Sequence, residues 1–292
     1  MTYDTVTRPP TTEPRRRSGL GTLGRTVAVV LSLLLVVWGA LSLAGQLSRE
    51  DAHSSATFRG ATALEVGLGF ESVEIRGSAT ATTVRMTRSY SWSFTRPTTS
   101  QSQSGGQVTV RSSCGFSPGR GCTGHVRLVV PEDLPVTVRT SDGSAVLHDL
   151  TGAVTVHTSD GHLSLRDISG PVDGSTSDGG IDATGLSARS TFQTRDGSLR
   201  ATGLSSPSVT AESSDGSVEL VFDRPPSTVT AQSRDGSVEV RVPDDGTAYR
   251  VSTDVSDGHE DVSVPTDPAS PRRIDVRTSD GSITVRTAGS GA

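Results

Sequence analysis

The sequence contains no lysine and few aromatic residues. All 27 basic residues of the 292 are arginine, a bias typical of GC-rich bacterial genomes rather than of any chemistry. Aromatic residues make up 4% and hydrophobic residues 32%, so any core must be thin and built from Val, Leu, Ile and Ala. The 32 glycines and 15 prolines disfavour a helical bundle and favour many short strands joined by turns.

Motifs for catalysis or metal binding are also missing. There is no G-x-S-x-G and no HExxH pattern. The six histidines are scattered along the chain: His53, His125, His148, His157, His162 and His259. We therefore expect no catalytic residues, no cofactor and no enzymatic activity.

A basic surface is absent from the C-terminal half. Residues 1–135 contain 14 Arg against 9 acidic residues, whereas residues 136–292 contain 13 Arg against 23. Binding to nucleic acid requires a basic face for the phosphates. The charge distribution thus argues against a nucleic-acid partner.

Residues 26–48 contain no charged side chain. As a helix these 23 residues would be about 35 Å long, enough to cross a hydrocarbon core of about 30 Å. Five arginines and only two acids precede the run, and this bias keeps the N-terminal side in the cytoplasm. The pattern predicts a single-pass membrane protein that contacts the lipid bilayer through residues 26–48, with a cytoplasmic tail at 1–25 and an extracellular C-terminal domain.

A cleaved signal peptide is the alternative, because Ser42, Leu43 and Ala44 resemble a cleavage site. Apolar regions of signal peptides usually span about 7–15 residues, so the longer run favours an uncleaved anchor. No cysteine lies near this segment, which excludes a lipoprotein anchor, and no LPxTG-like motif closes the chain.

The only two cysteines are Cys114 and Cys122. Outside the cytoplasm a disulfide is their natural state. We expect it to close a hairpin between strands at 108–111 and 125–130, with a stabilisation of roughly 2–3 kcal/mol. A redox or metal pair is disfavoured because no third cysteine and no histidine cluster accompany them.

An Asp-Gly turn recurs eight times, at spacings of 18 to 23 residues. Alternating apolar residues flank each turn, which predicts two short strands per unit. We expect the glycine to supply a positive φ. The aspartates are Asp142, Asp160, Asp178, Asp196, Asp215, Asp235, Asp257 and Asp280.

One such unit buries almost nothing alone, so the units should coil onto one another in sequence order. The predicted fold class is all-β: a β-solenoid with two strands per coil and repeats of about 18 residues, preceded by one transmembrane α-helix. Beyond the helix we predict a linker at 49–57 and N-terminal β coils with a cap and the disulfide hairpin at 58–135. The repeat solenoid should cover 136–286, and a short tail 287–292.

The T-S-D-G-S-V-x-V periodicity behind one apolar helix resembles the bacterial putative-adhesin domain of unknown function, a β-solenoid repeat family. The resemblance covers roughly residues 60–286. It implies an anchored envelope protein with a role in adhesion and without a catalytic set. The seventh unit departs from the pattern, because Glu260 occupies an inward apolar position.

Stacked coils would align the eight aspartates along one edge, at the strand spacing of about 5 Å. Such a row of like charges either binds Ca²⁺ or is tolerated as solvated turns. Calcium-binding β-rolls use a denser glycine-rich nonapeptide that is absent here, so the turn interpretation is preferred and no metal is assigned.

A second row, of outward threonines, suggests ice binding as a remote alternative, although Asp173, Ser252 and Asp275 interrupt it. Its members are Thr137, Thr155, Thr191, Thr210 and Thr230.

The leading hypothesis is a non-enzymatic, membrane-anchored, extracellular, adhesin-like solenoid that presents a polar face to a surface protein or glycan. One alternative is an envelope-sensing or regulatory membrane protein acting through a partner of the arginine cluster at 15–17. The second alternative is a calcium-binding surface protein.

Overall fold

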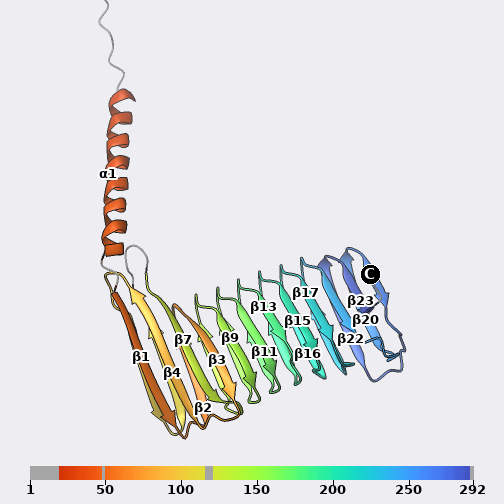
Figure 1. Cartoon of the computed structure of the whole chain (residues 1–292). Coiled ribbons are helices and arrows are strands. Elements are labelled where there is room, and N and C mark those ends of the chain that lie inside the picture. Colours follow the sequence, from red (N-terminus) through yellow and green to blue (C-terminus); the bar gives the residue numbers. More distant parts are fainter. Residues whose placement is uncertain (1–19, 48–49, 116–120, 290–292) are drawn as a thin grey trace, which may run out of the picture.

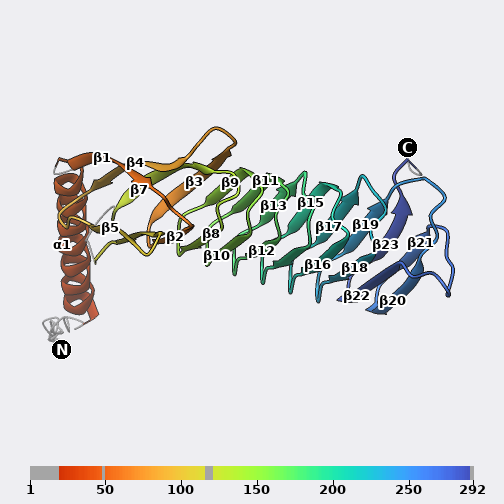
Figure 2. The ribbon, with the colours of Figure 1, turned by 90° about the horizontal axis from the view of Figure 1, so that it is seen from below.

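The computed structural model describes residues 20–47, 50–115 and 121–289. Helix α1 (Leu20–Leu47) stands apart at one end of a long rod of strands (Figure 1). Seen from below, after a turn of 90°, the rod consists of two layers of strands that run side by side along its length (Figure 2). The predicted tail at 1–25 lies almost entirely outside the described residues.

The described strands form two sheets, of twelve and eleven strands, which we call the A sheet and the B sheet. The A sheet contains β1 (Glu50–Arg59), β3 (Glu71–Ser78), β4 (Thr83–Trp92), β7 (Thr123–Pro131), β9 (Ala145–Leu150), β11 (Leu163–Ile168), β13 (Ile181–Thr184), β15 (Leu199–Leu204), β17 (Val218–Phe222), β19 (Val238–Val242), β21 (Glu260–Ser263) and β23 (Ile283–Thr287). The B sheet contains β2 (Ala63–Leu68), β5 (Thr98–Ser104), β6 (Gln107–Ser113), β8 (Val136–Thr140), β10 (Val154–Thr158), β12 (Val172–Ser175), β14 (Ser190–Gln193), β16 (Ser208–Glu212), β18 (Thr228–Gln232), β20 (Arg250–Asp257) and β22 (Arg273–Asp280).

Each repeat contributes one strand to each sheet, and neighbouring repeats pair in parallel. In the B sheet, Val136, Val154 and Val172 lie side by side, one from each of three successive coils. An 18-residue period therefore brings the same repeat position into register, so every inward position faces inward in each coil. The prediction of an all-β fold with two strands per coil is confirmed.

The core lies between the two sheets and consists mostly of aliphatic side chains, several from each coil. Val, Leu, Ile and Ala fill the inward positions before and after most of the Asp-Gly turns, and nearly all of them are fully buried. Leu150, Ile168, Leu186 and Leu204 close the core at the opposite edge. The inward positions predicted from alternation are correct in these coils. Phe192 and Phe222 are the aromatic residues that the core of the regular coils accommodates.

The coils do not all stack in sequence order. At the C-terminal end β22 pairs with β18 and β23 pairs with β19, so the eighth repeat lies directly on the sixth. The seventh repeat, β20 and β21, is displaced to the outer edge. The expected sequential order is wrong here. Glu260 explains the exchange, because on the edge strand β21 its carboxylate stays exposed, whereas in an inner coil it would be buried.

The N-terminal end also departs from simple coiling. The coil β2–β3 packs against β8 and β9, and the later coil β6–β7 packs on its outer side. Beyond these lie β5, antiparallel to β6, and β4, antiparallel to β7. Strand β1 pairs with β4 over its full length, so the linker predicted at 49–57 is wrong. It is a mostly exposed edge strand with one hydrogen-bonded neighbour, and Ala56 and Phe58 pack against the core from it.

Cys114 and Cys122 form a disulfide. They do not close a hairpin as predicted, because β6 belongs to the B sheet and β7 to the A sheet. The disulfide instead spans the corner at which the chain passes from one sheet to the other. Alternation alone predicted the two strands but not their assignment to different sheets.

The described side chains of α1 are exposed on all sides, including Leu35 at 66% and Trp38 at 70% exposure. The helix does not pack its apolar surface onto the solenoid (Figure 1). Among the described residues, no helical stretch has the length and apolar character that crossing a bilayer requires.

Candidate functional site

The Asp-Gly turns form one continuous corner of the solenoid, built by backbone hydrogen bonds from coil to coil. The N–H of Asp178 donates to the carbonyl of Ser159, and that of Asp196 to Ser177. Asp280 donates to Arg234 at 2.8 Å, which places its turn next to that of Asp235. This corner therefore follows the spatial order of the coils, with the turn of Asp257 outermost.

The turn glycines do not have positive φ, contrary to our expectation; among the described residues positive φ occurs elsewhere, for example at Gly185 and Gly203. The need for glycine is steric. A Cβ on Gly197 would overlap the carbonyl of Gly179 in the preceding coil, and a Cβ on Gly179 would overlap that of Gly161. Close stacking of the turns thus requires a missing side chain at each level.

A column of buried hydroxyl groups lies beneath the turns, two residues before each aspartate. The Thr194 hydroxyl accepts a hydrogen bond from the Gly197 N–H at 3.2 Å and donates one to the Gly179 carbonyl at 3.1 Å. Thr176, Ser213 and Ser233 make the same pair of bonds. Sequence reasoning missed this column, although a Thr or Ser precedes seven of the eight turns at this position.

All eight aspartates are exposed at the corner. Desolvation within the turn, followed by repulsion from Asp178 and Asp142, raises the pKa of the Asp160 carboxyl. The same causes, with different neighbours, raise the pKa of Asp196 and of Asp235. In the part of the chain that the structure describes, no three acidic, histidine or cysteine side chains are arranged to hold a metal ion.

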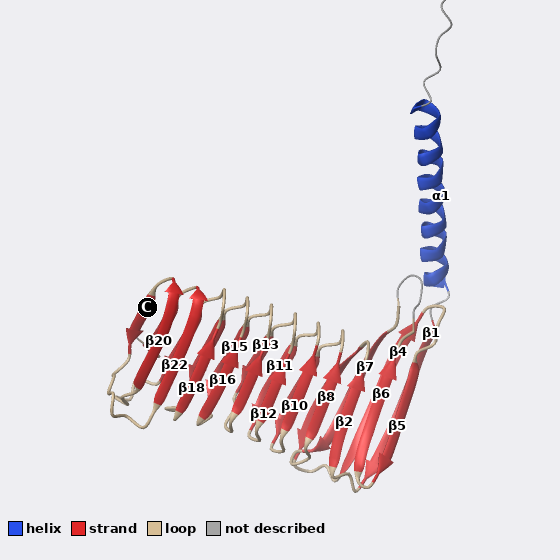
Figure 3. Cartoon of the chain, turned by 180° about the vertical axis from the view of Figure 1, so that it is seen from behind, coloured by secondary structure: helices blue, strands red, loops and turns tan. Residues whose placement is uncertain are grey.

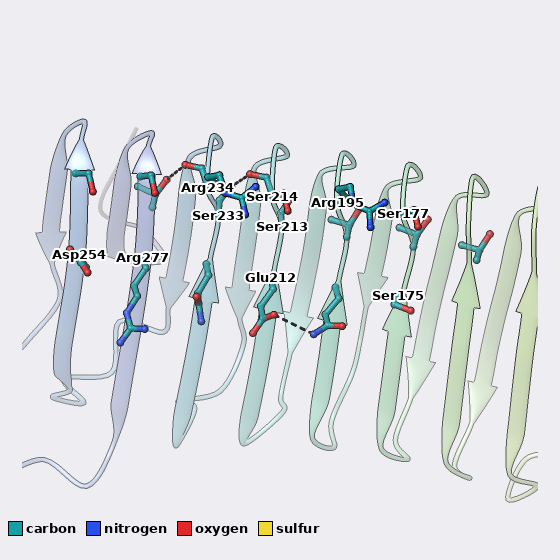
Figure 4. Close-up of a pocket in the computed structure, with 18 residues that line it drawn as sticks. Ser175, Ser177, Arg195, Glu212, Ser213, Ser214, Ser233, Arg234, Asp254 and Arg277 are labelled. Carbon is teal, nitrogen blue, oxygen red and sulfur yellow. Dashed lines mark hydrogen bonds between the residues drawn. The ribbon is translucent and has the colours of Figure 1, made fainter.

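A groove of about 700 Å³ runs along the B sheet beside this corner and is lined by residues of seven coils (Figure 4). Its floor on the sheet side is a row of in-register side chains: Ser175, Gln193, Glu212, Gln232, Arg277 and Asp254. Its other wall consists of the residues just before the aspartates, among them Arg195, Ser214 and Arg234. The lining is entirely polar.

Three arginines and two acidic residues, Glu212 and Asp254, are the charged side chains of the groove. Arg195, Arg234 and Arg277 are exposed, and none forms an ion pair with a described carboxylate. Arg195 and Arg234 are two coils apart, which corresponds to about 10 Å at the usual strand spacing. Glu212 accepts a hydrogen bond from the Gln193 amide at 3.2 Å and keeps its negative charge, so the lining carries three positive and two negative side chains.

The outward threonines predicted as a row lie on the same B-sheet face, paired in register from Thr137 to Thr230. Asp173 interrupts the row between Thr155 and Thr191, and Asp275 follows Thr230.

The outer face of the A sheet is different, because its charges neutralise one another. Glu219 pairs with Arg200 at 2.6 Å, and Glu239 pairs with Arg241 and Arg286, both at 2.7 Å. A hydrogen bond from Arg241, together with one from Arg286, lowers the pKa of Glu239. This face offers few unpaired charges for a ligand.

The histidines do not assemble into a site. His148 lies on the A sheet near Glu74 and Asp149, and His157 lies on the B sheet, where it bonds Ser175 at 2.6 Å. His162 pairs with Asp182. His148, His157 and His162 therefore have separate partners and do not come together.

One buried ion pair lies at the N-terminal end of the same corner, and sequence patterns gave no signal for it. Arg88 on β4 approaches Glu71 at 3.0 Å, and both side chains are buried. Burial raises the pKa of Glu71 against the opposing effects of Ser112 and Arg88. The pair joins the antiparallel cap to the first parallel coil.

Two parallel sheets joined coil by coil, with a glycine-lined corner and no catalytic cluster among the described residues, define a β-solenoid-like repeat protein. The sequence model of the Toastrack DUF4097 family matches residues 62–286, and the chain belongs to this family. The predicted family resemblance is confirmed for the solenoid, whereas the transmembrane helix is not.

Three solved structures are similar to the chain, and each aligns with 82% of it. A putative adhesin from Parabacteroides merdae has 11% identity, a TM-score of 0.48 and 96% of its own chain aligned. A putative adhesin from Bacteroides fragilis has 10% identity, a TM-score of 0.43 and 97% aligned. A putative cell adhesion protein from Clostridium sporogenes has 9% identity, a TM-score of 0.24 and 100% aligned. No curated protein matches the chain.

Proposed function

We propose that the chain is a non-enzymatic, adhesin-like surface protein whose B-sheet groove binds an acidic glycan. The observation that carries this proposal is the groove itself, where three arginines outside any described ion pair outnumber two carboxylates among hydroxyl and amide groups. Guanidinium groups bind carboxylate and sulfate groups strongly, and the neighbouring hydroxyl and amide groups suit sugar hydroxyls. Protein–protein interfaces usually depend on a few buried aromatic side chains, and no aromatic residue lines the groove. A glycan is therefore favoured over a protein as the ligand.

We further propose that residues 26–48 anchor the solenoid in the cell membrane, with the N-terminus in the cytoplasm and the solenoid outside. Support comes from the uncharged run of 23 residues and from the arginines that precede it. The exposure of apolar side chains along α1 agrees with a helix whose partner is lipid.

Binding of soluble polysaccharides to the full chain in detergent tests the glycan proposal. Polygalacturonate should bind and neutral dextran should not, and added salt should weaken the binding. Replacing two of the three groove arginines, Arg195→Gln with Arg234→Gln, should lower the affinity about tenfold or more, because hydrogen bonds to charged groups are lost. Arg166→Gln is the matched control, since Arg166 is exposed on the A sheet, away from the groove.

Equal binding of the two polymers, or an equal loss in the Arg166→Gln control, would refute a role for the groove. Binding of neither polymer would remove the glycan from the proposal. For the anchor, a reporter that works only in the cytoplasm, fused after Ala292, should be silent; activity there would reverse the proposed topology.

A further inference from the structure

Helix α1 leaves the solenoid at the corner that carries the Asp-Gly turns. Only two residues separate its end at Leu47 from Glu50, and Glu50 pairs with Trp92, the last residue of β4. Ser91 in turn lies opposite Thr123 at the start of β7. Strand β7 is parallel to β3 and β9, whose first residues follow that corner. The views from front and back show the helix rising from this edge (Figures 1 and 3).

The turn after β4 therefore lies beside the helix exit. Three residues of chain reach at most about 11 Å, so Glu50 lies within that distance of the helix end. Trp92, its partner on β4, lies at most one strand spacing of about 5 Å farther away. The turn comprises residues 93–96, which follow Trp92 directly. The Cys114–Cys122 disulfide lies next to this turn, with the Cys122 sulfur 3.9 Å from the Thr95 carbonyl oxygen.

This turn holds a bulky residue in a strained conformation. The Thr95 N–H donates to the Ser93 carbonyl at 2.8 Å, and the residue between them, Phe94, has a φ of 65°. The resulting three-residue turn is rare and strained, and glycine would adopt it more easily. Phe94 is also 45% exposed, and outside α1 it is the one large apolar side chain exposed among the described residues.

Two packed aromatic rings and an arginine lie next to Phe94. Trp92 is 7% exposed and stacks against Tyr90, with ring centroids 5.5 Å apart. The Arg96 guanidinium lies over the Trp92 ring at 5.4 Å. In a chain with 4% aromatic residues, three of them and an arginine are thus gathered within seven residues.

We propose that residues 94–96 contact the headgroup region of the bilayer that α1 enters, with Phe94 inserted and Arg96 facing lipid phosphates. Aromatic side chains and arginines are the residues that favour this region. A second contact beside the helix would fix the rotation of the solenoid about the helix axis, which a short connection alone does not do. This inference rests on the membrane anchor proposed above.

Tryptophan quenching in lipid vesicles tests the contact. The full chain carrying Trp38→Phe is reconstituted into vesicles of anionic and zwitterionic phospholipids, some with a quencher near the headgroup. Phe94→Trp in this background should add emission that the lipid quenches, roughly twofold more strongly than that of Pro268→Trp at the far end of the rod. The parent chain, which retains Trp92, gives the signal to subtract.

A second variant separates this role from a structural one. Phe94→Gly should leave the thermal midpoint unchanged or raise it, because the strain is relieved. In the same variant, the quencher in the lipid should no longer reduce the emission of Trp92. A lower midpoint would instead show that Phe94 supports the fold, and this would overturn the proposal.

The outcomes distinguish this contact from the anchor. A chain that floats with the vesicles but shows equal quenching at positions 94 and 268 keeps the anchor and refutes the contact. A chain that does not float with the vesicles refutes both.

Discussion

At the scale of single residues, the glycine of each turn sets how closely two coils approach. Gly197→Ala should destabilise the chain by about 1–3 kcal/mol, because the new Cβ meets the Gly179 carbonyl and the two coils must separate. Since stability in a solenoid depends on interfaces between neighbours, Gly197→Val should do more damage and spread it to adjacent coils.

Thermal or denaturant unfolding measures both effects. Gly67→Ala is the control, because a Cβ there meets only the Arg111 side chain at 3.7 Å and its φ is not positive. It should be neutral or stabilise by about 0.5 kcal/mol. Equal effects at positions 67 and 197 would contradict the steric explanation.

The buried hydroxyl of Thr194 should matter as much as the glycine above it. Thr194→Val keeps the shape and removes both a donor and an acceptor, so the Gly197 N–H and the Gly179 carbonyl lose their partner. A cost of about 1–3 kcal/mol is expected. Thr191→Val on the outward row of the same strand should change the unfolding free energy by less than about 0.5 kcal/mol. Comparable losses in the two variants would argue against the hydroxyl column.

The acidic corner should make stability rise on mild acidification. Desolvation and repulsion raise the pKa of Asp196 above its unfolded value, so its ionised form opposes folding. The unfolding free energy should then increase as the pH falls toward that raised pKa. Asp196→Asn should be neutral or slightly stabilising at pH 7, with a smaller gain on acidification. At still lower pH, protonation of Glu239, whose pKa is lowered by the hydrogen bonds from Arg241 and Arg286, should break its ion pairs and reverse the trend.

Thermal midpoints of the wild type and Asp196→Asn across this pH range provide the test. If the aspartates act only as turn residues, millimolar Ca²⁺ should leave both midpoints unchanged. A midpoint that rises with Ca²⁺ in the wild type, and rises less in the variant, would identify the row as a metal site.

The sequence was informative about inward residues and turns because each depends on a local pattern. Alternation predicted inward apolar residues on both sides of the turns, where Leu163 and Leu165 are indeed buried, and the repeated Asp-Gly located the corner. The reason for the glycine was not accessible, because the overlap at Gly197 involves a carbonyl 18 residues away. Neither Arg88 nor Glu71 belongs to a repeat, so no pattern could have paired them.

At the scale of elements, the exchanged order of the last two coils is the feature that separates this fold from simple stacking. Ser237 and Ser282 precede paired residues of β19 and β23, and the Ser282 N–H contacts the Ser237 hydroxyl at 3.3 Å. Ser237→Cys with Ser282→Cys should therefore form a disulfide under mild oxidation.

Peptide mapping by mass spectrometry detects that crosslink. Ser237→Cys with His259→Cys is the control, since sequential stacking would bring those two positions together. A crosslink in the control and none in the test pair would restore the sequential order.

Two residues carried a signal for this exchange. Glu260 replaces an inward apolar residue, and Val255 replaces the hydroxyl found before the other seven turns. Both are tolerable in a coil with a neighbour on one side only. Recognising the outer coil required knowing that the hydroxyl column continues into a neighbouring turn, which the sequence does not show. The antiparallel cap was similarly hidden, because β5 carries polar residues on both faces and β1 has only Ala56 and Phe58 packed against the core.

At the scale of the whole molecule, helix exit, acidic corner and groove lie along one edge of the rod (Figures 1 and 4). If α1 is anchored as proposed, this edge faces the membrane, and a ligand in the groove lies close to the bilayer surface. The opposite edge and the neutralised A-sheet face would then point away from the bilayer.

The exchanged order at the C-terminal end has a mechanical consequence. Strand β23, which ends at Thr287 near the C-terminus, is hydrogen-bonded on both sides, whereas β1, which follows α1, is bonded on one side only. A chain stretched between its two ends should yield first at β1, which peels from β4 one bond at a time. In single-molecule pulling, the first extension should be about 35 Å, the length of ten residues. Initial loss of the last coil would contradict this. Tension between the membrane and the C-terminus would therefore detach β1 first, while the solenoid and its groove keep their shape.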